Sequence, residues 1–376
     1  MKRTVPIVLV AGAVALAACG SSSSSGSSSN STSSGATPTT ASSSGSSTGG
    51  SSGGGGSVTL QESGSSLMFP YLQGIVTAFH TANPTITVAP AAGGSGQGVS
   101  DAAAGTTDFG ASDAYLSPTE QATQTGLLNI PVVVSSQAVD YNLKGVKNLK
   151  LSGPVLTGMY LGTIKTWNDP AVKALNPGVA LPAEAVHPVH RSDSSGDTFL
   201  FSSYLSDTDP TFSSKVGPNE ILNLPAVSTS AAAKGNPGMV QSCSSTPGCV
   251  AYVGISAQKS AVAAGLGEAE LANAKGQFVQ SSPTTVDAAL AAAPPIPANL
   301  VVSLIDTKGP GAYPIVNFEY IIVKNTAKNG PAIQKFLDYV ISPSGGSAPA
   351  ALSSKNFEAL PSSVLPKVQA AIASIK

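Results

Sequence analysis

The sequence HRSDSSGDTF, residues 190–199, decides how the fold of this chain is interpreted. The stretch AVHPVHR, which ends at Arg191, is typical of a strand, and the stretch from Asp197 onward is typical of a helix. Arg191 is the only arginine of the chain apart from Arg3. A strand that passes through a Ser/Gly loop into a helix is the repeating unit of an α/β protein.

The same alternation continues along the chain of 376 residues and predicts sheets with helices packed on their faces. From the apolar periodicity we expect strands over residues 58–63, 85–91, 109–114, 127–143 (as one strand or two) and 313–324. We expect helices over residues 70–84 and 99–108, from about 197, and over 331–342 and 360–375.

The N-terminus has the pattern of an export signal, because Lys2 and Arg3 precede an uncharged apolar stretch and then small residues up to Cys19. Residues 16–19, Leu-Ala-Ala-Cys, resemble a bacterial lipoprotein signal. The resemblance implies a signal peptide over residues 1–18 and a lipidated, palmitate-bearing cysteine at position 19. The alternative is an uncut anchor helix, although the apolar stretch is short for a membrane span.

A change of composition separates this leader from the body of the protein. Residues 20–57 are almost wholly Ser, Gly, Thr, Ala and Asn, without charge, so residues 19–56 are predicted to form a disordered tether behind the lipidated cysteine. The body, residues 57–376, exceeds the size at which one core usually suffices, so we expect two lobes. The formal net charge is −1, which indicates no general attraction to nucleic acid.

Two cysteines remain in the body, Cys243 and Cys249, within CSSTPGC. In an exported chain, two cysteines around a turn-forming Pro-Gly predict a disulfide that closes a small loop. The alternative, a pair of metal ligands, lacks further Cys or His partners nearby in sequence. No metal site or cofactor is therefore expected.

Three Gly/Ser loops precede predicted helices, at residues 62–70, 93–105 and 193–205. The first turn of a helix has unpaired N–H groups and the positive end of the helix dipole, and glycine allows a ligand to approach the backbone closely. Several such ends at one point would form an anion site with little formal charge. Each loop alone could equally be an ordinary N-cap. None matches a nucleotide P-loop or a dinucleotide fingerprint.

Several segments together resemble the PstS family, the phosphate-binding proteins of ABC transporters, over nearly the whole body, and most closely its actinobacterial lipoproteins. The resemblance implies an α/β, two-lobed periplasmic-binding-protein fold (type II), with mixed sheets flanked by helices and the ligand in the inter-lobe cleft. The segments are GSSLMFP, GGSGQGV, DFGASDAYLS, LGTIKTWNDPAVKALNPG, HRSDSSGDTFLFSSYL and CVAYVGIS.

The resemblance also implies which residues of this chain bind phosphate. Which member of residues 65–68 donates is left open, because this loop matches the family pattern loosely. Asp193 is implied as the carboxylate that pairs with the arginine. The implied binding residues are Ser65, Ser66, Leu67, Ser95, Asp113, Arg191, Ser195, Gly196 and Asp197.

An arginine fork suits a tetrahedral oxyanion, and a buried arginine needs a carboxylate such as Asp193 to neutralise it. A weak ion pair on a surface turn is the alternative for Arg191. Asp113 and Asp197 suit a ligand that carries protons, since a carboxylate only accepts hydrogen bonds and sulfate has none to donate. Their alternative roles are a cap for the helix near Ser117 and a partner of the helix dipole.

In the fold that the resemblance implies, the chain crosses between the lobes near residues 140–142 and 314–316. One lobe would contain residues 57–141 and 316–376, and the other residues 142–315. The expected function is to capture phosphate outside the cytoplasm, on a lipid-anchored, monomeric receptor, and to deliver it to the permease and ATPase subunits of the transporter. The alternatives are another oxyanion, a surface adhesin, or an enzyme, for which no nucleophile or metal motif is present.

Overall fold

The structure is a computed structural model that describes residues 56–376. The predictions of a signal peptide, a lipidated Cys19 and a tether fall outside these residues. The strands are β1 (Val58–Gly64), β2 (Ile86–Ala89), β3 (Phe109–Ser112), β4 (Leu127–Tyr141), β5 (Lys150–Leu151), β6 (His187–Arg191), β7 (Ala231–Ala233), β8 (Cys249–Gly254), β9 (Gly267–Glu268), β10 (Glu270–Ala272), β11 (Phe278–Val279) and β12 (Val316–Lys324).

Helices follow most of these strands, as the alternation in the sequence predicts. They are α1 (Phe69–Ala82), α2 (Ser95–Ala104), α3 (Pro118–Thr123), α4 (Gly153–Tyr160), α5 (Pro170–Leu175), α6 (Gly196–Thr208), α7 (Pro210–Lys215), α8 (Gly235–Ser244), α9 (Gln258–Ala263), α10 (Pro283–Ala291), α11 (Gly330–Ile341), α12 (Pro349–Ser353) and α13 (Leu365–Ala373), with a 3₁₀ turn at Ile255–Ala257.

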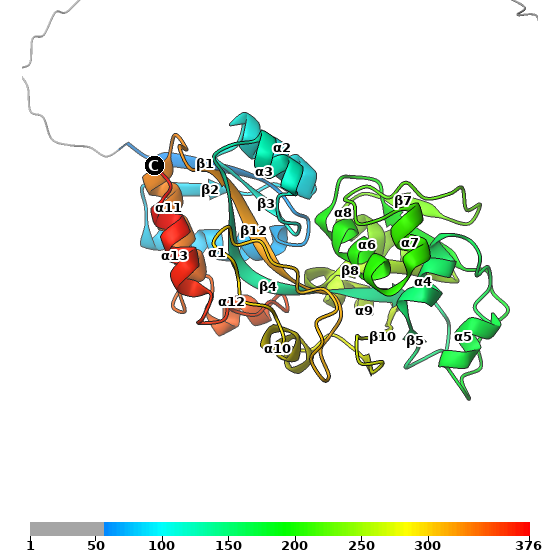
Figure 1. Cartoon of the computed structure of the whole chain (residues 1–376). Helices are drawn as coiled ribbons and strands as arrows, with labels where there is room; N and C mark the ends of the chain where they lie inside the picture. Colours follow the sequence, from blue (N-terminus) through cyan, green and yellow to red (C-terminus); the bar gives the residue numbers. More distant parts are fainter. Residues whose placement is uncertain (1–55) are drawn as a thin grey trace, which may run out of the picture. The chain divides into compact units, whose positions relative to one another are not determined.

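A long mixed sheet runs through the molecule, and β4 joins its two halves (Figure 1). The strand order is β2-β1-β3-β12-β4-β8-β6-β7, and β9 also pairs with β4. Residues 127–136 of β4 lie antiparallel to β12, and residues 137–141 lie antiparallel to β8. The hydrogen-bond partner of β4 therefore changes between Ser136 and Gln137. Nearly all of β4 is buried, including the polar residues that follow its apolar stretch IPVVV.

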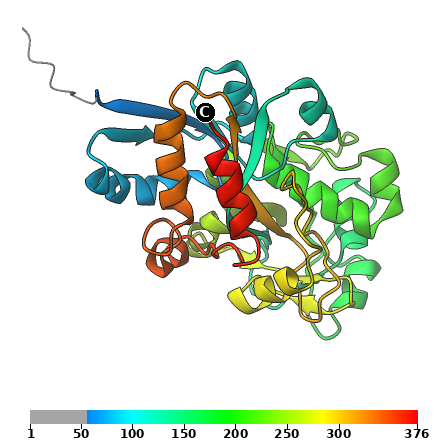
Figure 2. The same ribbon diagram turned by 60° about the vertical axis from the view of Figure 1, so that its left-hand side comes forward.

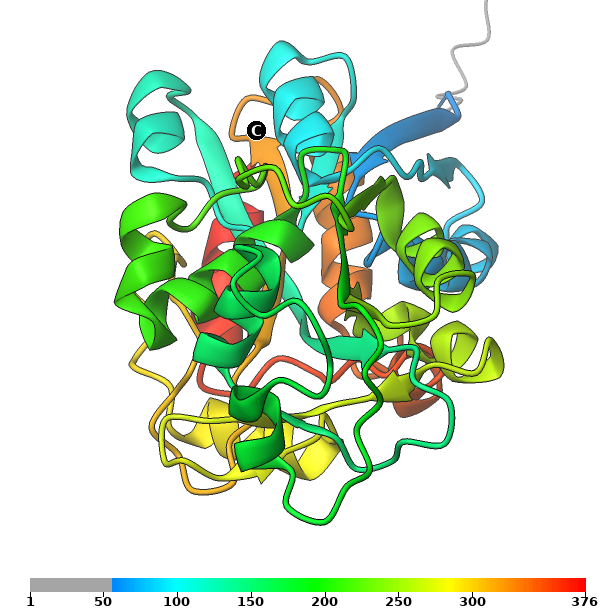
Figure 3. The ribbon, with the colours of Figure 1, turned by 90° about the vertical axis from the view of Figure 1, so that its right-hand side faces the viewer.

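Each half of the sheet is covered by its own helices. Helices α11 and α13 lie side by side over the half that contains β1, β3 and β12 (Figure 2), and Phe79 of α1 meets Phe336 of α11 edge-on at 5.0 Å between ring centroids. Helices α4, α6 and α7 face the viewer over the other half (Figure 3). There Phe201 of α6 stacks on Tyr252 of β8 at 4.6 Å. Aromatic packing therefore fixes helices against both halves.

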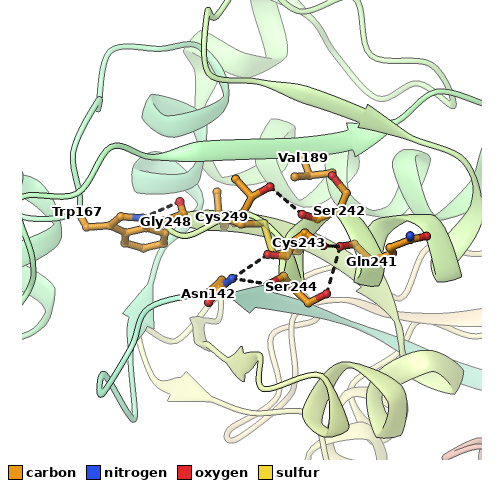
Figure 4. Close-up of a disulfide and its surroundings, with 12 residues drawn as sticks. Asn142, Trp167, Val189, Gln241, Ser242, Cys243, Ser244, Gly248 and Cys249 are labelled. Carbon is orange, nitrogen blue, oxygen red and sulfur yellow. Dashed lines mark hydrogen bonds between the residues drawn. A yellow bond between two sulfur atoms is a disulfide. The ribbon is translucent and has the colours of Figure 1, made fainter.

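A disulfide joins Cys243, near the end of α8, to Cys249, the first residue of β8 (Figure 4). The indole N–H of the fully buried Trp167 donates to the carbonyl of Gly248 at 2.8 Å. The side-chain amide of Asn142 donates to the carbonyl of Cys243 at 3.0 Å. The C-terminal end of α8 is thus fixed to β8 and to the segment that follows β4.

Two helices differ from the sequence prediction by more than two residues at an end. The helix predicted over 99–108 begins at Ser95 and ends at Ala104, because Gly94 and Gly105 both adopt positive φ and interrupt the helix on either side. The last helix begins at Leu365 rather than 360, because Pro366 favours the first turn. Residues 127–143 contain one strand rather than two. Between residues 56 and 376, no helix has the length and apolar character needed to cross a membrane.

Candidate anion-binding site

The three Gly/Ser loops lie against one another at the junction of the two sheet halves. A Cβ atom added to Gly196, the first residue of α6, would lie 2.6 Å from Cβ of Asp113 and 2.7 Å from Oγ of Ser95. A Cβ atom on Gly94 would lie 2.6 Å from the carbonyl oxygen of Ser194. Glycine is therefore needed at both positions, because the backbones approach too closely for any side chain.

The helices that follow these loops have no side-chain caps. The N-cap residues Met68, Gly94 and Ser195 of α1, α2 and α6 make no side-chain hydrogen bond to the first turn. By contrast, Ser117 of α3 forms a complete capping box with Glu120, so the helix near Ser117 does not use Asp113 as its cap. The three loops are therefore not ordinary side-chain N-caps. In α1 the amides of Phe69 and Tyr71 donate to the carbonyls of Ser65 and Met68, so the first-turn amides that could serve a ligand are those of α2 and α6.

Arg191 is buried at this junction and is only 3% exposed. Its Nε and Nη2 donate to the two carboxylate oxygens of Asp193 at 2.8 and 2.5 Å, and its Nη1 donates to Oδ2 of Asp197 at 2.9 Å. Burial opposes the charge of Arg191, but Asp193 and Asp197 outweigh it and raise the pKa of the guanidinium. Burial also opposes the charge of Asp193, and Arg191 outweighs it and lowers that pKa. The ion pair between Arg191 and Asp193 is therefore buried, and is not a weak ion pair on a surface turn.

Asp197 is completely buried in the first turn of α6 and accepts hydrogen bonds from three side chains. Besides Arg191, the amide of Asn236 donates to its Oδ2 at 2.6 Å, and the amide of Gln137 donates to its Oδ1 at 3.1 Å. Burial, and then the neighbouring Asp113, raise the pKa of Asp197 to about 7, although these donors oppose the shift. Asp197 therefore holds a proton more readily than an ordinary aspartate does.

The serines of the first two loops converge on Asp113, which is 1% exposed. The hydroxyl of Ser65 donates to its Oδ1, and the hydroxyl of Ser95 donates to its Oδ2 at 3.2 Å. The oxygen of Ser65 also accepts from the amides of Leu67 and Met68, each at 3.0 Å. These contacts hold the Asp113 carboxylate beside the amides of the first loop.

The remaining sequence-predicted residues lie in the same cluster. The backbone amide of Asn236 donates to Oγ of Ser66 at 3.1 Å, which links the first loop to α8. The hydroxyl of Ser195 is fully buried and has no hydrogen-bond partner among residues 56–376. A buried hydroxyl without a partner is costly, so Ser195 is a group that a ligand oxygen would satisfy.

Three residues of the cluster were not predicted from the sequence, namely Gln137, Asn236 and Glu319. Gln137 and Glu319 are polar residues in buried strands, and all three residues are at most 2% exposed. A polar side chain in a strand that is covered on both faces needs a buried hydrogen-bond partner. The polar residues of these strands were therefore the feature of the sequence that could have indicated a site here. Asn236 follows Gly235 in the first turn of α8, so KGNPG is a fourth glycine-containing helix start at the site.

The donors and acceptors suit a protonated oxyanion. Arg191, the serine hydroxyls and the first-turn amides of α2 and α6 supply positive charge and hydrogen-bond donors. Asp113 and Asp197 supply acceptors for a ligand O–H. Residues 56–376 contain no cluster of three or more His, Cys, Asp or Glu side chains arranged to hold a metal ion.

Comparison with known proteins assigns the family. The family model described as a PBP superfamily domain matches residues 23–344. The phosphate-binding protein PstS of Methanocaldococcus jannaschii is 33% identical over 314 residues, which cover 76% of this chain and 79% of that protein. The phosphate-binding protein PstS 3 of Mycobacterium leprae is 35% identical over 306 residues, which cover 75% and 79%. The chain belongs to the PstS family.

Solved structures share the two-lobed fold of this PstS-family chain. A phosphate-binding protein from Stenotrophomonas maltophilia is 22% identical, covers 84% of this chain and 94% of its own, and has a TM-score of 0.66. The phosphate-bound PfluDING protein is 21% identical, covers 83% and 93%, and has a TM-score of 0.67. The predictions of the PstS family and of an α/β periplasmic-binding-protein fold are confirmed.

Proposed function

We propose that this PstS-family protein captures inorganic phosphate in the cluster around Arg191 and delivers it to the membrane permease and ATPase subunits of an ABC transporter. The observation that carries the proposal is the buried guanidinium of Arg191, held by Asp193 and Asp197 near the unpartnered Ser195 hydroxyl. A fixed arginine fork matches phosphate geometry, and the two aspartates favour a ligand that carries protons.

We further propose that the two lobes are residues 57–141 with 316–376, and residues 142–315. The change of partner within β4, from β12 to β8, supports this division. Ser65, Ser95 and Asp113 would belong to one lobe, and Arg191 and Asp197 to the other. Phosphate would then bridge the lobes and select their closed arrangement, which small-angle scattering would detect as compaction on binding.

The attachment of the protein is also a proposal. The sequence 16–19 supports cleavage of a signal peptide and lipidation of Cys19, so that residues 19–56 tether a monomeric, non-enzymatic receptor to the outer face of the cell membrane. Globomycin-sensitive processing and mass spectrometry of the mature N-terminus test this step. Retention of the full N-terminal segment without lipid would contradict it.

Calorimetric titration of the purified protein, stripped of bound anion, tests the function directly. We expect tight one-to-one binding of phosphate and no heat with sulfate, because sulfate presents only acceptors to Asp113 and Asp197. Binding of sulfate or molybdate would support the other oxyanion receptors instead. Binding of no anion would favour an adhesin, and turnover of p-nitrophenyl phosphate would favour an enzyme.

A further inference from the structure

Glu319 is a third buried acid at the proposed phosphate site. It lies in β12, is 0% exposed, and its Oε1 accepts a hydrogen bond from the hydroxyl of Ser135 in β4 at 2.5 Å. Its Oε2 is buried and has no donor partner among residues 56–376. A buried carboxylate oxygen without a donor carries a large desolvation cost, so the state in which Oε2 carries a proton is favoured.

The register of β12 directs Glu319 toward Asp113. Successive residues of a strand alternate between faces, so Asn317 and Glu319 share one face. The side-chain amide of Asn317 donates to the backbone carbonyl of Asp113, and the carboxyl of Glu319 lies within hydrogen-bonding reach of the carboxyl of Asp113. The pairing of β12 with β4 shifts register between Glu319 and Tyr320, a bulge of the kind that re-aims side chains near binding sites.

Two carboxyl groups in contact require a proton between them. If both were ionised, two acceptors would face each other in a water-excluded site, close also to the anionic ligand. The other titratable groups that act on Glu319 among residues 56–376 are Asp197 in α6, which is itself paired with Arg191, and Tyr320 beside it. Burial, followed by the charge of Asp113, raises the pKa of Glu319 well above its usual value.

Asp113 is the better of the two acids to carry the negative charge. It accepts hydrogen bonds from the hydroxyls of Ser65 and Ser95, whereas Glu319 receives only the one from Ser135. Glu319 thus has less hydrogen-bonding compensation for a buried negative charge than Asp113 has, so we assign the proton between the two carboxyl groups to Glu319.

We propose that Glu319 is a positioning residue of the phosphate site, a neutral acid that donates its proton to Asp113 and so keeps Asp113 ionised, oriented and able to accept the O–H of the ligand. This inference rests on the proposed function. With Glu319 uncharged, the site contains one negative charge fewer, and the remaining carboxylates do not exclude the anion.

The test compares wild type, E319Q, E319M and the control D140N in phosphate titrations from pH 5 to 9. Glutamine can accept from Ser135 and donate to Asp113, whereas methionine has the same length and does neither. We expect E319M to bind phosphate about tenfold or more weakly, since it removes a hydrogen bond to a charged group, and E319Q to recover most of that loss. Asp140 is a fully buried acid that contacts Gln258 instead, so D140N is expected to bind as wild type does.

The ratio of the E319Q and wild-type affinities isolates the proton of Glu319, because ionisation of the ligand and of Asp197 cancels. A neutral Glu319 predicts a ratio that stays within about threefold from pH 5 to 8. If Glu319 were ionised, E319Q would remove a like charge and bind phosphate at least about tenfold more tightly at neutral pH, and this result would overturn the proposal. Equal affinity of E319M and wild type would overturn it too.

A ligand-independent measurement separates this inference from the proposed function. The infrared difference spectrum between wild type and E319Q at neutral pH should contain the carbonyl band of a protonated carboxyl group, shifted in deuterated water. Its absence would overturn the inference even if phosphate binds normally. If the band is present but wild type binds no phosphate, the neutral acid is supported and the proposed function fails. This spectrum also decides the matter should E319M fail to fold.

Discussion

Replacing Gly196 by alanine should weaken phosphate binding without weakening the ligand-free fold. Gly196 is the first residue of α6, and a Cβ atom there would lie 2.6 Å from Cβ of Asp113, 2.7 Å from the amide nitrogen of Ala114 and 2.7 Å from Oγ of Ser95. Two of these three atoms belong to the backbone or are attached directly to it, so they cannot move aside as the end of a flexible side chain would. All three belong to the proposed opposite lobe.

The size of the effect follows from this overlap. One extra methyl group in a packed interior costs typically about 1–3 kcal/mol, which corresponds to a loss of affinity of about 5- to 150-fold if only the closed state experiences the contact. The open, ligand-free protein would not experience it, and alanine is a better helix former than glycine. The melting temperature without phosphate should therefore be unchanged or slightly higher in G196A.

Calorimetry with phosphate and thermal unfolding with and without phosphate test this prediction. The matched control is G238A in α8, where the added Cβ would lie 3.7 Å from its nearest neighbours, an ordinary contact. The control should bind phosphate as wild type does. The reasoning is refuted if G196A binds phosphate with wild-type affinity, or if it loses affinity only in proportion to a lower melting temperature in the absence of ligand.

Three further predictions concern charges and the disulfide. The substitution R191K should weaken phosphate binding at least about tenfold in the same titration. An ammonium group cannot contact Asp193 and Asp197 and still offer the ligand paired N–H donors as a guanidinium does. Wild-type affinity of R191K would contradict this prediction. Burial and Asp113 raise the pKa of Asp197 to about 7, so its negative charge grows as pH rises through neutrality. We therefore expect phosphate affinity at pH 5.5 to be at least as high as at pH 8. A much lower affinity at pH 5.5 would refute the role of Asp197. Loss of the disulfide in the double variant C243S/C249S should lower stability by about 2–4 kcal/mol, measured by chemical denaturation against wild type.

A stability prediction concerns Asp140, which lies outside the site. Burial raises its pKa to about 8, whereas the unfolded chain ionises it near 4. The folded state therefore holds the proton more tightly, and wild-type stability should fall as pH rises from about 4 to 8. In D140N this contribution is absent, so the melting temperature of D140N relative to wild type should rise with pH. A difference between the two proteins that is constant with pH would contradict this assignment.

The parts of the site that were predicted from the sequence are those with a local chemical signature. Arg191 and Asp193 share one short loop after a strand, and Ser95 and Gly196 open helices, so each has a recognisable neighbourhood. The sequence alone is compatible with Arg191 as an anion ligand or as part of a surface ion pair, and the burial of Arg191 decides against the surface ion pair. The family resemblance added the expectation that the three loops belong to one site.

The residues that were missed depend on tertiary register. Glu319 and Gln137 lie in strands whose sequences do not tell which polar residue faces which loop. The antiparallel pairing of β12 with β4 determines which polar side chains face the site. That pairing joins segments nearly two hundred residues apart in the chain. Asn236 reaches Ser66 and Asp197 from the first turn of α8, a helix that packs against β8. Such contacts follow from the assembled sheet and not from local propensity.

The continuity of β4 limits how the protein can open. Its residues 127–136 remain in a ladder with β12 and its residues 137–141 in a ladder with β8, so there is no slack loop between the halves at this crossing. If the two halves are the lobes proposed above, opening at this crossing would be a twist of β4 near the peptide between Ser136 and Gln137. A paired strand resists twisting more than a flexible loop resists bending. We therefore expect a narrow range of opening angles, and a rate of phosphate release that is set by the bonds between the two lobes.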